Sequence, residues 1–300
     1  MSYSSFELLD HSKPIVVFGR NGQVGRALQV CLKNLKTPVV FLGRSECDLS
    51  NELSIREVLN RYQPQVIINA AAYTAVDKAE DASQRELAFA INAKAPALMA
   101  RYIAHVSHGV LVHYSTDYVF DGEANQPYLS STKMDPVNYY GSTKAAGEAM
   151  AIEANEQTIV IRTSWVFSTH GNNFVKTMLR LMKEKESLNI VSDQKGRPTY
   201  AKDLAKATMQ MVQLLDAGQS IKGIFHYANQ GETTWFDFAA KIKSIAGLSC
   251  ILNPIDSAAF PTPAKRPKYS VLSTQKIESL LTAPIPNWED ALQACLQKLG

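Results

Sequence analysis

Short apolar runs rich in β-branched residues alternate with longer amphipathic stretches through the first half of the chain. The runs are typical of buried strands and lie at residues 15–18, 39–42, 66–68, 110–114 and 158–163. The stretches between them predict helices at residues 26–35, 54–62, 84–107 and 138–155. Regular alternation of strand and helix predicts an α/β fold, in which a doubly wound parallel sheet of the Rossmann type carries helices on both faces.

The pattern changes after Trp165. Glycine, asparagine and proline cluster at residues 171–173, 194–198 and 258–267 and mark loops. Helices are predicted at residues 173–185, 202–215, 235–245 and 288–299. We expect this second half to form a smaller region over the carboxyl ends of the strands, with some of its elements returning to the core.

A glycine-rich turn connects the first predicted strand to the first predicted helix. Its residues, 19–25, have the spacing G-x-x-G-x-x-G. After a strand and before a helix, this spacing is typical of a dinucleotide site, because the glycines permit a tight turn and a close approach to a pyrophosphate. A plain turn between strand and helix is the alternative. The expected cofactor contacts are Gly19, Asn21, Gly22, Gln23, Val24 and Gly25.

The ends of the next two strands indicate which dinucleotide binds. Sites for NAD usually place an acid after the second strand, to hold the ribose 2′-hydroxyl. This chain has Arg44 there, and a guanidinium suits a 2′-phosphate, so we expect NADPH, with NADH also accepted. A solvated surface charge is the alternative for Arg44. The other expected contacts are Asp48 and Leu49, near the adenine, and Ala70, Ala71 and Ala72 after the third strand.

These signals divide the chain into three parts. Residues 1–12 are polar and are expected to form an N-terminal extension. Residues 13–168 carry the strands and the glycine turn and are expected to form the NAD(P)-binding Rossmann core. Residues 169–300 are expected to bind mainly substrate.

Three further side chains form a candidate proton-transfer group. Thr116 ends the fourth predicted strand, and Tyr140 and Lys144 lie four residues apart on a predicted helix, hence on one face. A lysine charge is expected to lower the pKa of the tyrosine from about 10 towards neutrality. The tyrosine could then exchange a proton with a carbonyl oxygen that the Thr116 hydroxyl holds in place. We therefore interpret the three residues as the catalytic group of an oxidoreductase.

The composition of the chain limits the classes of binding partner that we expect. The net charge is +3 over 300 residues, so we expect neither a nucleic-acid nor a membrane surface. No apolar run approaches the roughly twenty residues of a membrane helix, and the polar N-terminus is no signal peptide. The four cysteines do not form a C-x-x-C pair or show metal spacing with a histidine, which favours a reducing cytoplasm and no metal site.

Together these motifs resemble a known family. The chain resembles the extended short-chain dehydrogenase/reductases, and within them the dTDP-4-dehydrorhamnose reductase family. Tyr-x-x-x-Lys alone marks the superfamily, and the combination of motifs is more specific. The segments that carry the resemblance are Gly19–Gly25, Asn69–Glu80, Ser115–Gly122, Tyr140–Glu148, Arg162–Phe167, Gly171–Phe174, Val191–Gln194, Arg197–Tyr200 and Pro261–Pro267.

The resemblance implies NADPH-dependent reduction of the C4 keto group of dTDP-4-dehydro-L-rhamnose, a step in cell-surface polysaccharide synthesis such as that of lipopolysaccharide. Tyr140 would donate the proton, Lys144 would hold the nicotinamide ribose, and Thr116 would bond the keto oxygen. Tyr140 and Lys144 would thus also contact the cofactor. The remaining expected substrate contacts are Asp117, Tyr118, Trp165, Asn172, Arg197 and Arg266.

Three points stay open at the level of sequence. Some relatives bind magnesium between subunits through a glutamate where this chain has Ala27, so we do not expect Mg²⁺ or that form of homodimer, while another homodimer is not excluded. A non-catalytic regulatory subunit of the methionine adenosyltransferase type shares the fold. A reductase that acts on a related dTDP-4-keto-6-deoxysugar is another alternative. An enzyme of the same superfamily that catalyses an epimerase or dehydratase step is a further one. A dehydratase usually has a glutamate directly after the acid, and none follows Asp117 here.

Overall fold

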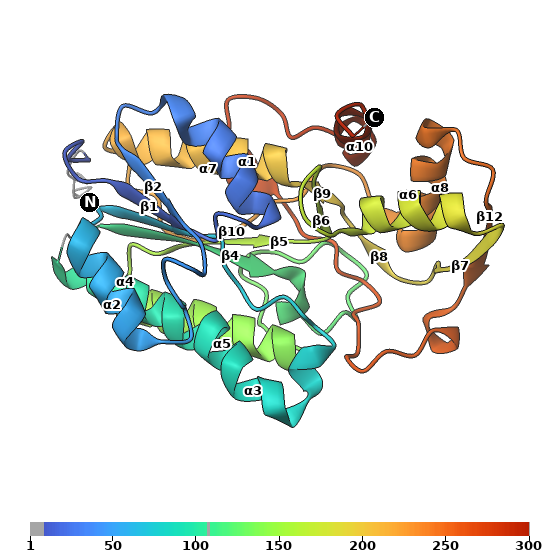
Figure 1. Cartoon of the computed structure of the whole chain (residues 1–300), viewed down its shortest axis with the longest axis horizontal. Coiled ribbons are helices and arrows are strands. Elements are labelled where there is room, and N and C mark those ends of the chain that lie inside the picture. Colours follow the sequence, from blue (N-terminus) through green and yellow to red (C-terminus); the bar gives the residue numbers. More distant parts are fainter. Residues whose placement is uncertain (1–8, 107–108, 300) are drawn as a thin grey trace.

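Six strands form one central sheet with the order β10-β5-β4-β3-β1-β2 (Figure 1). Every neighbouring pair is parallel, which confirms the predicted α/β fold with a parallel sheet. The strands are β1 (Ile15–Phe18), β2 (Val39–Leu42), β3 (Val66–Asn69), β4 (Val110–Thr116), β5 (Ile159–Thr163) and β10 (Gly223–His226). The computed structural model describes residues 9–106 and 109–299.

Helices cover both faces of this sheet (Figure 1). One face carries α1 (Gln23–Cys31) and α7 (Ala201–Asp216), and the other carries α2 (Glu52–Tyr62), α4 (Ala95–Val106) and α5 (Tyr139–Ala154). The two layers follow from the alternation of side chains along a strand. Ile15 packs in the core of the first layer and Val16 in the core of the second, and both are buried.

Two features of this sheet layer were not predicted. The sixth strand, β10, is a four-residue segment that begins with glycine and pairs with β5. The single helix expected over residues 84–107 is α3 (Ala82–Phe89), a π-helical turn (Ala90–Lys94) and α4. The turn places Asn92 in the interior, where its amide bonds to the backbone of Tyr73 and to Thr143. Asn92 is therefore a fully buried packing residue whose amide is satisfied by hydrogen bonds.

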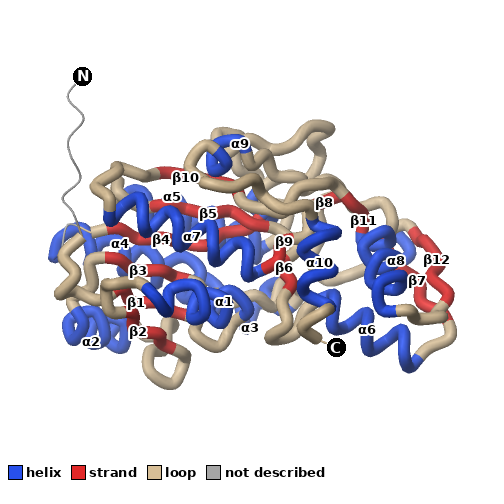
Figure 2. Tube along the Cα trace, turned by 90° about the horizontal axis from the view of Figure 1, so that it is seen from above, coloured by secondary structure: helices blue, strands red, loops and turns tan. Residues whose placement is uncertain are grey.

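The second half builds a smaller region at the carboxyl ends of the strands (Figure 2). It contains three two-stranded sheets, β6 with β9, β7 with β12, and β8 with β11. Its core includes Phe167, Met178, Phe238 and Trp288. Its elements are β6 (Val166–Phe167), α6 (Phe174–Glu184), β7 (Ser187–Val191), β8 (Lys195–Gly196), β9 (Thr199–Tyr200), β11 (Thr233–Thr234), α8 (Trp235–Ala246), β12 (Ile251–Ile255) and α10 (Trp288–Leu296). The short helix α9 (Gln275–Glu278) lies beside β10 of the central sheet instead (Figure 2).

Residues 1–8, 107–108 and 300 lie outside the described residues. The predicted N-terminal extension is therefore described only from residue 9, and the predicted helix over residues 84–107 only to residue 106. Within the described ranges, no helix is long and apolar enough to cross a membrane.

Candidate active site

The glycine turn lies between β1 and α1 and approaches the end of β3. Gly19 has φ +91°, and a Cβ there would lie 2.6 Å from the carbonyl carbon of Ala70. A Cβ on Gly25 would lie 2.0 Å from the carbonyl oxygen of Gly19. Only glycine fits these two positions. Gly22 caps α1 without a side-chain hydrogen bond, so no side chain of the cap covers the first amides of this helix.

The ends of β2 and β3 adjoin this turn, because the amides of Gly19 and Arg20 donate to the carbonyl of Leu42 and Gly19 approaches Ala70. Arg44 is exposed, and Asp48 accepts hydrogen bonds from the amide and hydroxyl of Ser50. Ala70, Ala71 and Ala72 are half-buried after β3. Two residues that the sequence interpretation missed lie here as well. They are Arg20 and Glu46, whose side chains form an ion pair at 2.7 Å.

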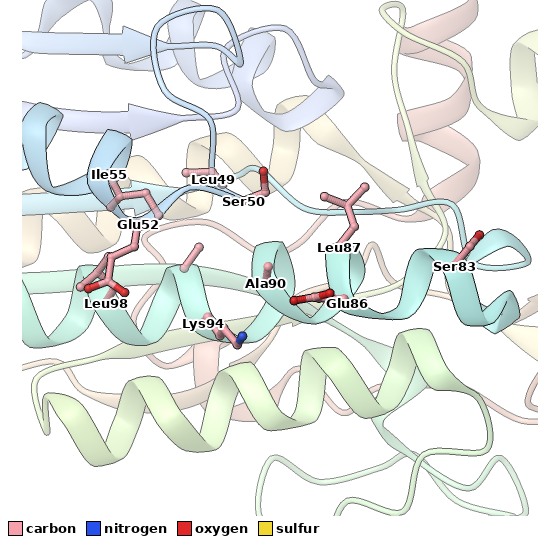
Figure 3. Close-up of a pocket in the computed structure, with 11 residues that line it drawn as sticks. Leu49, Ser50, Glu52, Ile55, Ser83, Glu86, Leu87, Ala90, Lys94 and Leu98 are labelled. Carbon is pink, nitrogen blue, oxygen red and sulfur yellow. The ribbon is translucent and has the colours of Figure 1, made fainter.

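A cavity of about 470 Å³ opens beside Leu49. Figure 3 shows that it lies between the segment that contains Leu49 and Ser50 and the helical segment that contains Leu87 and Ala90. None of the predicted catalytic residues lines it. The cavity therefore adjoins the predicted adenine contact and lies outside the catalytic group.

Thr116 and Tyr140 meet at the carboxyl end of β4. Thr116 is 7% exposed, and its hydroxyl donates to Asp117 at 3.0 Å and accepts from the amide of Tyr118 at 3.2 Å. Tyr140 is 8% exposed and packs edge-on against Tyr118. Burial raises the pKa of Tyr140, the charge of Asp117 raises it further, and hydrogen bonding with Thr116 opposes the rise.

Lys144 extends into the interior and away from the phenol. Its Nζ donates to the carbonyl oxygen of Tyr114 at 2.7 Å and lies 3.1 Å from Nε2 of His113. Burial lowers the pKa of Lys144 to about 8, and the charge of Glu148 opposes this effect. The expectation that Lys144 brings the pKa of Tyr140 towards neutrality is therefore not met in this structure. Burial of the phenol dominates, and the ammonium is directed to other acceptors.

Three hydrogen bonds fix the N-terminus of α5, the helix that carries Tyr140. Asn138 caps the helix by accepting from the amide of Gly141 at 2.8 Å, and its own amide donates to the carbonyl of Lys265. The carboxylate of Glu80 accepts from the amide of Tyr139 at 2.7 Å. An N-cap of this kind stabilises a helix by about 1 kcal/mol, and the long-range bonds hold the catalytic helix against loops from both halves of the chain.

Asp117 is an unusual carboxylate. It is 2% exposed, and its Oδ2 is a buried oxygen without a hydrogen-bond partner. Burial raises the pKa of Asp117 to about 6, although hydrogen bonds, that with Ser270 first, lower it. A carboxyl group with such a pKa, next to Tyr140, can change its charge near neutral pH.

Two predicted substrate contacts lie in the second half. Trp165 has φ +47° and stacks on Trp235 with the ring centroids 3.5 Å apart. A Cβ on Gly196 would lie 2.5 Å from Cε2 of the same indole, so the ring packs directly against the backbone of β8 as well as against Trp235. Asn172 is exposed on the loop before α6. Its neighbour Asn173 donates to the side chain of Gln23 at 2.9 Å, which links this loop to the glycine turn.

The two arginines among the predicted substrate contacts differ in their partners. Arg197 donates to the carbonyl of Leu272, but its Nε is buried without a partner. Arg266 donates to both carboxylate oxygens of Asp77, at 3.0 and 2.8 Å. Arg197 therefore has a free buried donor at Nε and a loose ion pair with Glu232 at 3.9 Å, whereas Arg266 is paired directly with Asp77 at 2.8 Å.

Metal coordination is not indicated at this site. In the part of the chain that the structure describes, no group of three or more His, Cys, Asp or Glu side chains could hold a metal ion. Ala27, at the position where some relatives carry a glutamate, is buried in α1. The absence of magnesium stays a prediction.

The fold and the site together define a short-chain dehydrogenase/reductase. The defining features are the parallel Rossmann sheet, the glycine turn after its first strand and the buried Thr–Tyr–Lys group near the end of its fourth strand. A family model described as the RmlD substrate binding domain matches residues 13–300. The dTDP-4-dehydrorhamnose reductase of Escherichia coli K12 is 40% identical over 294 residues, which cover 95% of this chain and 97% of that protein. The chain therefore belongs to the RmlD family, the dTDP-4-dehydrorhamnose reductases.

Solved structures of dTDP-4-dehydrorhamnose reductases are similar to this chain in fold and in sequence. The crystal structure of a dTDP-4-dehydrorhamnose reductase from Clostridium acetobutylicum superposes with a TM-score of 0.88 at 38% identity, over 95% of this chain and 99% of that one. A Bacillus anthracis dTDP-4-dehydrorhamnose reductase in complex with NADP superposes with a TM-score of 0.86 at 35% identity, over 95% of this chain and 99% of that one.

Proposed function

We propose that the protein reduces the C4 keto group of dTDP-4-dehydro-L-rhamnose to give dTDP-L-rhamnose, with NADPH as reductant. The observation that carries this proposal is the buried group of Thr116, Tyr140 and Lys144 at the end of β4, in a chain that belongs to the dTDP-4-dehydrorhamnose reductase family. The expected role is a late step in the synthesis of a cell-surface polysaccharide.

Tyr140 is proposed to be the acid of this reaction. NADPH supplies, when bound, the hydride that adds to C4 of the sugar. The Oη–H of Tyr140 gives its proton to the C4 oxygen, so that carbon gains the hydride and oxygen gains the proton. The raised pKa of Tyr140 keeps the phenol protonated across the physiological range, and Thr116 holds the accepting oxygen. Lys144, which lies one helical turn beyond Tyr140 on α5, is proposed to hold the nicotinamide ribose through its ammonium group.

The glycine turn is proposed to hold the pyrophosphate of NADPH. The features that support this are the close approach of Gly19 to Ala70 and the uncapped start of α1 at Gly22, because free helix N–H groups favour an anion. The other proposed cofactor contacts are Asn21, Gln23, Val24, Gly25, Arg44, Asp48, Leu49, Ala71, Ala72, Tyr140 and Lys144.

The substrate is proposed to lie between the end of β4 and the smaller region, which is residues 169–300 in the main. Asp117, Tyr118, Trp165 and Asn172 are proposed to face the sugar. The buried donor of Arg197 supports a role with the diphosphate. Arg266 can take part only by sharing its charge between the phosphate and Asp77.

The test of this function is oxidation of NADPH, followed by its near-ultraviolet absorbance, with freshly generated dTDP-4-dehydro-L-rhamnose. The generating enzymes alone are the control, and the sugar product is identified by NMR. We expect consumption that requires this protein and yields dTDP-L-rhamnose. A different deoxysugar would revise the substrate. Tight NADPH binding with no consumption for any related keto-sugar would favour the regulatory-subunit alternative.

The cellular setting is proposed to be the cytoplasm. All four cysteines are free thiols, and Cys47, Cys250 and Cys295 are buried, which suits a reducing compartment. Whether the chain forms a homodimer is tested by sedimentation equilibrium of the full chain with and without Mg²⁺. We expect no dependence on the metal.

A further inference from the structure

Residues 262–270 form a strap that connects elements from both halves of the chain. One end of the strap is fixed to Asp77, in the loop after β3. The guanidinium of Arg266 donates to both carboxylate oxygens of Asp77, at 3.0 and 2.8 Å, and the amide of Ala264 donates to Oδ1 at 3.2 Å. Nη1 of Arg266 also donates to the carbonyl of Ala264 and to the hydroxyl of Thr262. The ion pair therefore braces the strap internally and ties it to the first half of the chain.

The strap next meets the helix that carries the proposed acid. The carbonyl of Lys265 accepts from the side-chain amide of Asn138 at 2.8 Å, and Asn138 caps α5 two residues before Tyr140. Gly122 has φ +80°, and a Cβ at this position would overlap Pro267, so glycine permits the close approach of the strap. This part of the strap is thus held against the N-terminus of α5 and against the loop after β4.

The far end of the strap reaches the side of the site where the sugar is proposed to bind. The amide of Lys195 donates to the carbonyl of Lys268 at 2.7 Å, and the amide of Ser270 donates to the carbonyl of Lys195 at 2.8 Å. These bonds join the strap to β8, against which the indole of Trp165 packs. A hydrogen bond also joins Ser270 to Asp117. The strap is therefore connected to proposed sugar contacts as well as to the helix of the acid.

The ion pair at the start of the strap is charged and partly open to solvent. The hydrogen bond from Arg266, first among the causes, lowers the pKa of Asp77, so this carboxylate is ionised at neutral pH. The side chains of Arg266 and Asp77 are 25% and 42% exposed. A pair this exposed contributes little to the stability of the whole protein, whereas a bidentate pair fixes geometry closely. Its removal should therefore loosen the strap without unfolding the chain.

We propose that Asp77 is a positioning residue for the reduction. Its carboxylate holds Arg266, and through it the strap, where Ser270 meets Asp117. The same placement keeps the carbonyl of the strap against Asn138, at the start of the helix that carries the acid. Without the charge of Asp77, the strap moves away from the sugar side of the site, and substrate binding weakens more than turnover. This inference rests on the proposed function, because it assigns a residue that assembles that site.

Steady-state oxidation of NADPH with dTDP-4-dehydro-L-rhamnose tests this role. Asp77→Asn keeps the side-chain shape and removes the charge, whereas Arg266→Lys keeps the charge and removes the planar fork. We expect each variant to raise the KM for the keto-sugar about tenfold, to lower kcat by a smaller factor and to leave the Kd for NADPH unchanged. The double variant should be no worse than the more affected single variant, because both changes break the same pair.

Cleavage by trypsin after Lys268 reports on the strap without any substrate. Lys268 is exposed, and its carbonyl is bonded to the backbone of Lys195, so cleavage requires the strap to open. The rate of cleavage tracks the population of the open form when opening is fast. Followed by mass spectrometry, cleavage at this bond should be about tenfold faster in Asp77→Asn and in Arg266→Lys than in the wild type, as the KM values are.

Glu289→Gln is the matched control for charge. Glu289 is 47% exposed and forms an ion pair with Lys241 that joins α10 to α8, outside the strap. Its replacement should change neither the KM for the keto-sugar nor the rate of cleavage after Lys268. Thermal unfolding shows whether each variant is folded, and Arg266→Lys carries the same two expectations independently of Asp77→Asn.

The two measurements separate the strap from the reaction. An unchanged KM or an unchanged rate of cleavage in folded Asp77→Asn overturns the inference and leaves the proposed reduction standing. A lower KM in this variant also overturns it, because Asp77 would then compete with the substrate for Arg266. Effects that multiply in the double variant overturn it as well, because the two residues would then act separately. Faster cleavage in both single variants, without reduction of any keto-sugar by the wild type, overturns the proposed function alone.

Discussion

Nε2 of His113 lies 3.1 Å from Nζ of Lys144, and both side chains are only 1% exposed. On the other side of the ring, Nδ1 faces the amide nitrogen of Asn69 at 3.2 Å, and the oxygen of that amide accepts from the backbone N–H of Ala71. Asn69 thus donates to Nδ1, and the ring proton is on Nε2. This proton points at Lys144 and disfavours its ammonium form.

The pKa of Lys144 predicts an alkaline limit to activity. Burial lowers this pKa to about 8, so the ammonium is lost as the pH rises through that value. The titratable groups that act on Lys144 are His113 and Glu148, and the raised pKa of Tyr140 keeps its phenol protonated in this range. We expect kcat/KM for the keto-sugar to fall above about pH 8, in a profile measured from pH 6 to 10. A flat profile through this range would contradict the role of the Lys144 charge.

Replacement of His113 should move that limit. In His113→Phe the proton that opposes the ammonium is gone, so the alkaline limb should shift to higher pH. Unfolding by urea should show a loss of about 1–3 kcal/mol, because Asn69 is left without its buried partner.

His226→Phe is the matched control for His113→Phe. His226 is another fully buried histidine, bonded to the carbonyl of Tyr128, and it lies near Arg162 instead of Lys144. His226→Phe should lower the free energy of unfolding but leave the alkaline limb of the pH profile at the same pH as in the wild type. A limb that moves to lower pH in His113→Phe would show that the ring accepts from Lys144, contrary to the assignment above.

Removal of Glu148 should affect stability and catalysis together. Glu148 and Arg162 are 0% and 1% exposed and are joined by a hydrogen bond of 2.7 Å. Glu148→Gln leaves the guanidinium buried without a counter-charge, which should cost about 3–5 kcal/mol of unfolding free energy. Because Glu148 raises the pKa of Lys144, the alkaline limb should also move to lower pH. A loss of stability without a shift of the alkaline limb would show that Glu148 does not affect the pKa of Lys144.

The Trp165–Trp235 stack should matter for substrate binding. Trp235→Leu removes the ring that supports Trp165 while keeping an apolar residue at this position. We expect the KM for the keto-sugar to rise about tenfold or less, with kcat little changed, since aromatic pairs contribute about 0.5–1.5 kcal/mol beyond area burial. The Kd for NADPH, measured by calorimetry, is the control and should stay the same. A fall in kcat at constant KM would argue against this role.

Much of the fold could be predicted because its signals are local. Each of the five predicted strands contains a continuous run of three or four apolar residues, which is typical of a strand in a sheet covered on both faces. The missed strand, β10, begins with Gly223 and has only four residues, so its sequence does not differ from that of a loop. The π-helical turn at Ala90–Lys94 keeps the apolar composition of a helix, and the sequence period alone does not reveal it.

The site was predictable to the extent that it depends on motifs. Thr116 and Tyr140 meet at the carboxyl end of β4, and Lys144 shares a helix face with Tyr140 because the two are four residues apart, although its ammonium bonds to the carbonyl of Tyr114. The bond between Gln23 and Asn173 joins residues 150 positions apart and has no local signal.

Turnover in Tyr140→Phe tests the central claim most directly. The measurement is NADPH oxidation with dTDP-4-dehydro-L-rhamnose, beside the Kd for NADPH. Tyr139→Phe is the control, since its phenol bonds only the backbone carbonyl of Arg85 among the described residues. We predict that Tyr140→Phe lowers kcat by about a hundredfold or more with the Kd for NADPH nearly unchanged, while Tyr139→Phe stays close to the wild type. A Tyr140→Phe enzyme with near-normal turnover would contradict the account.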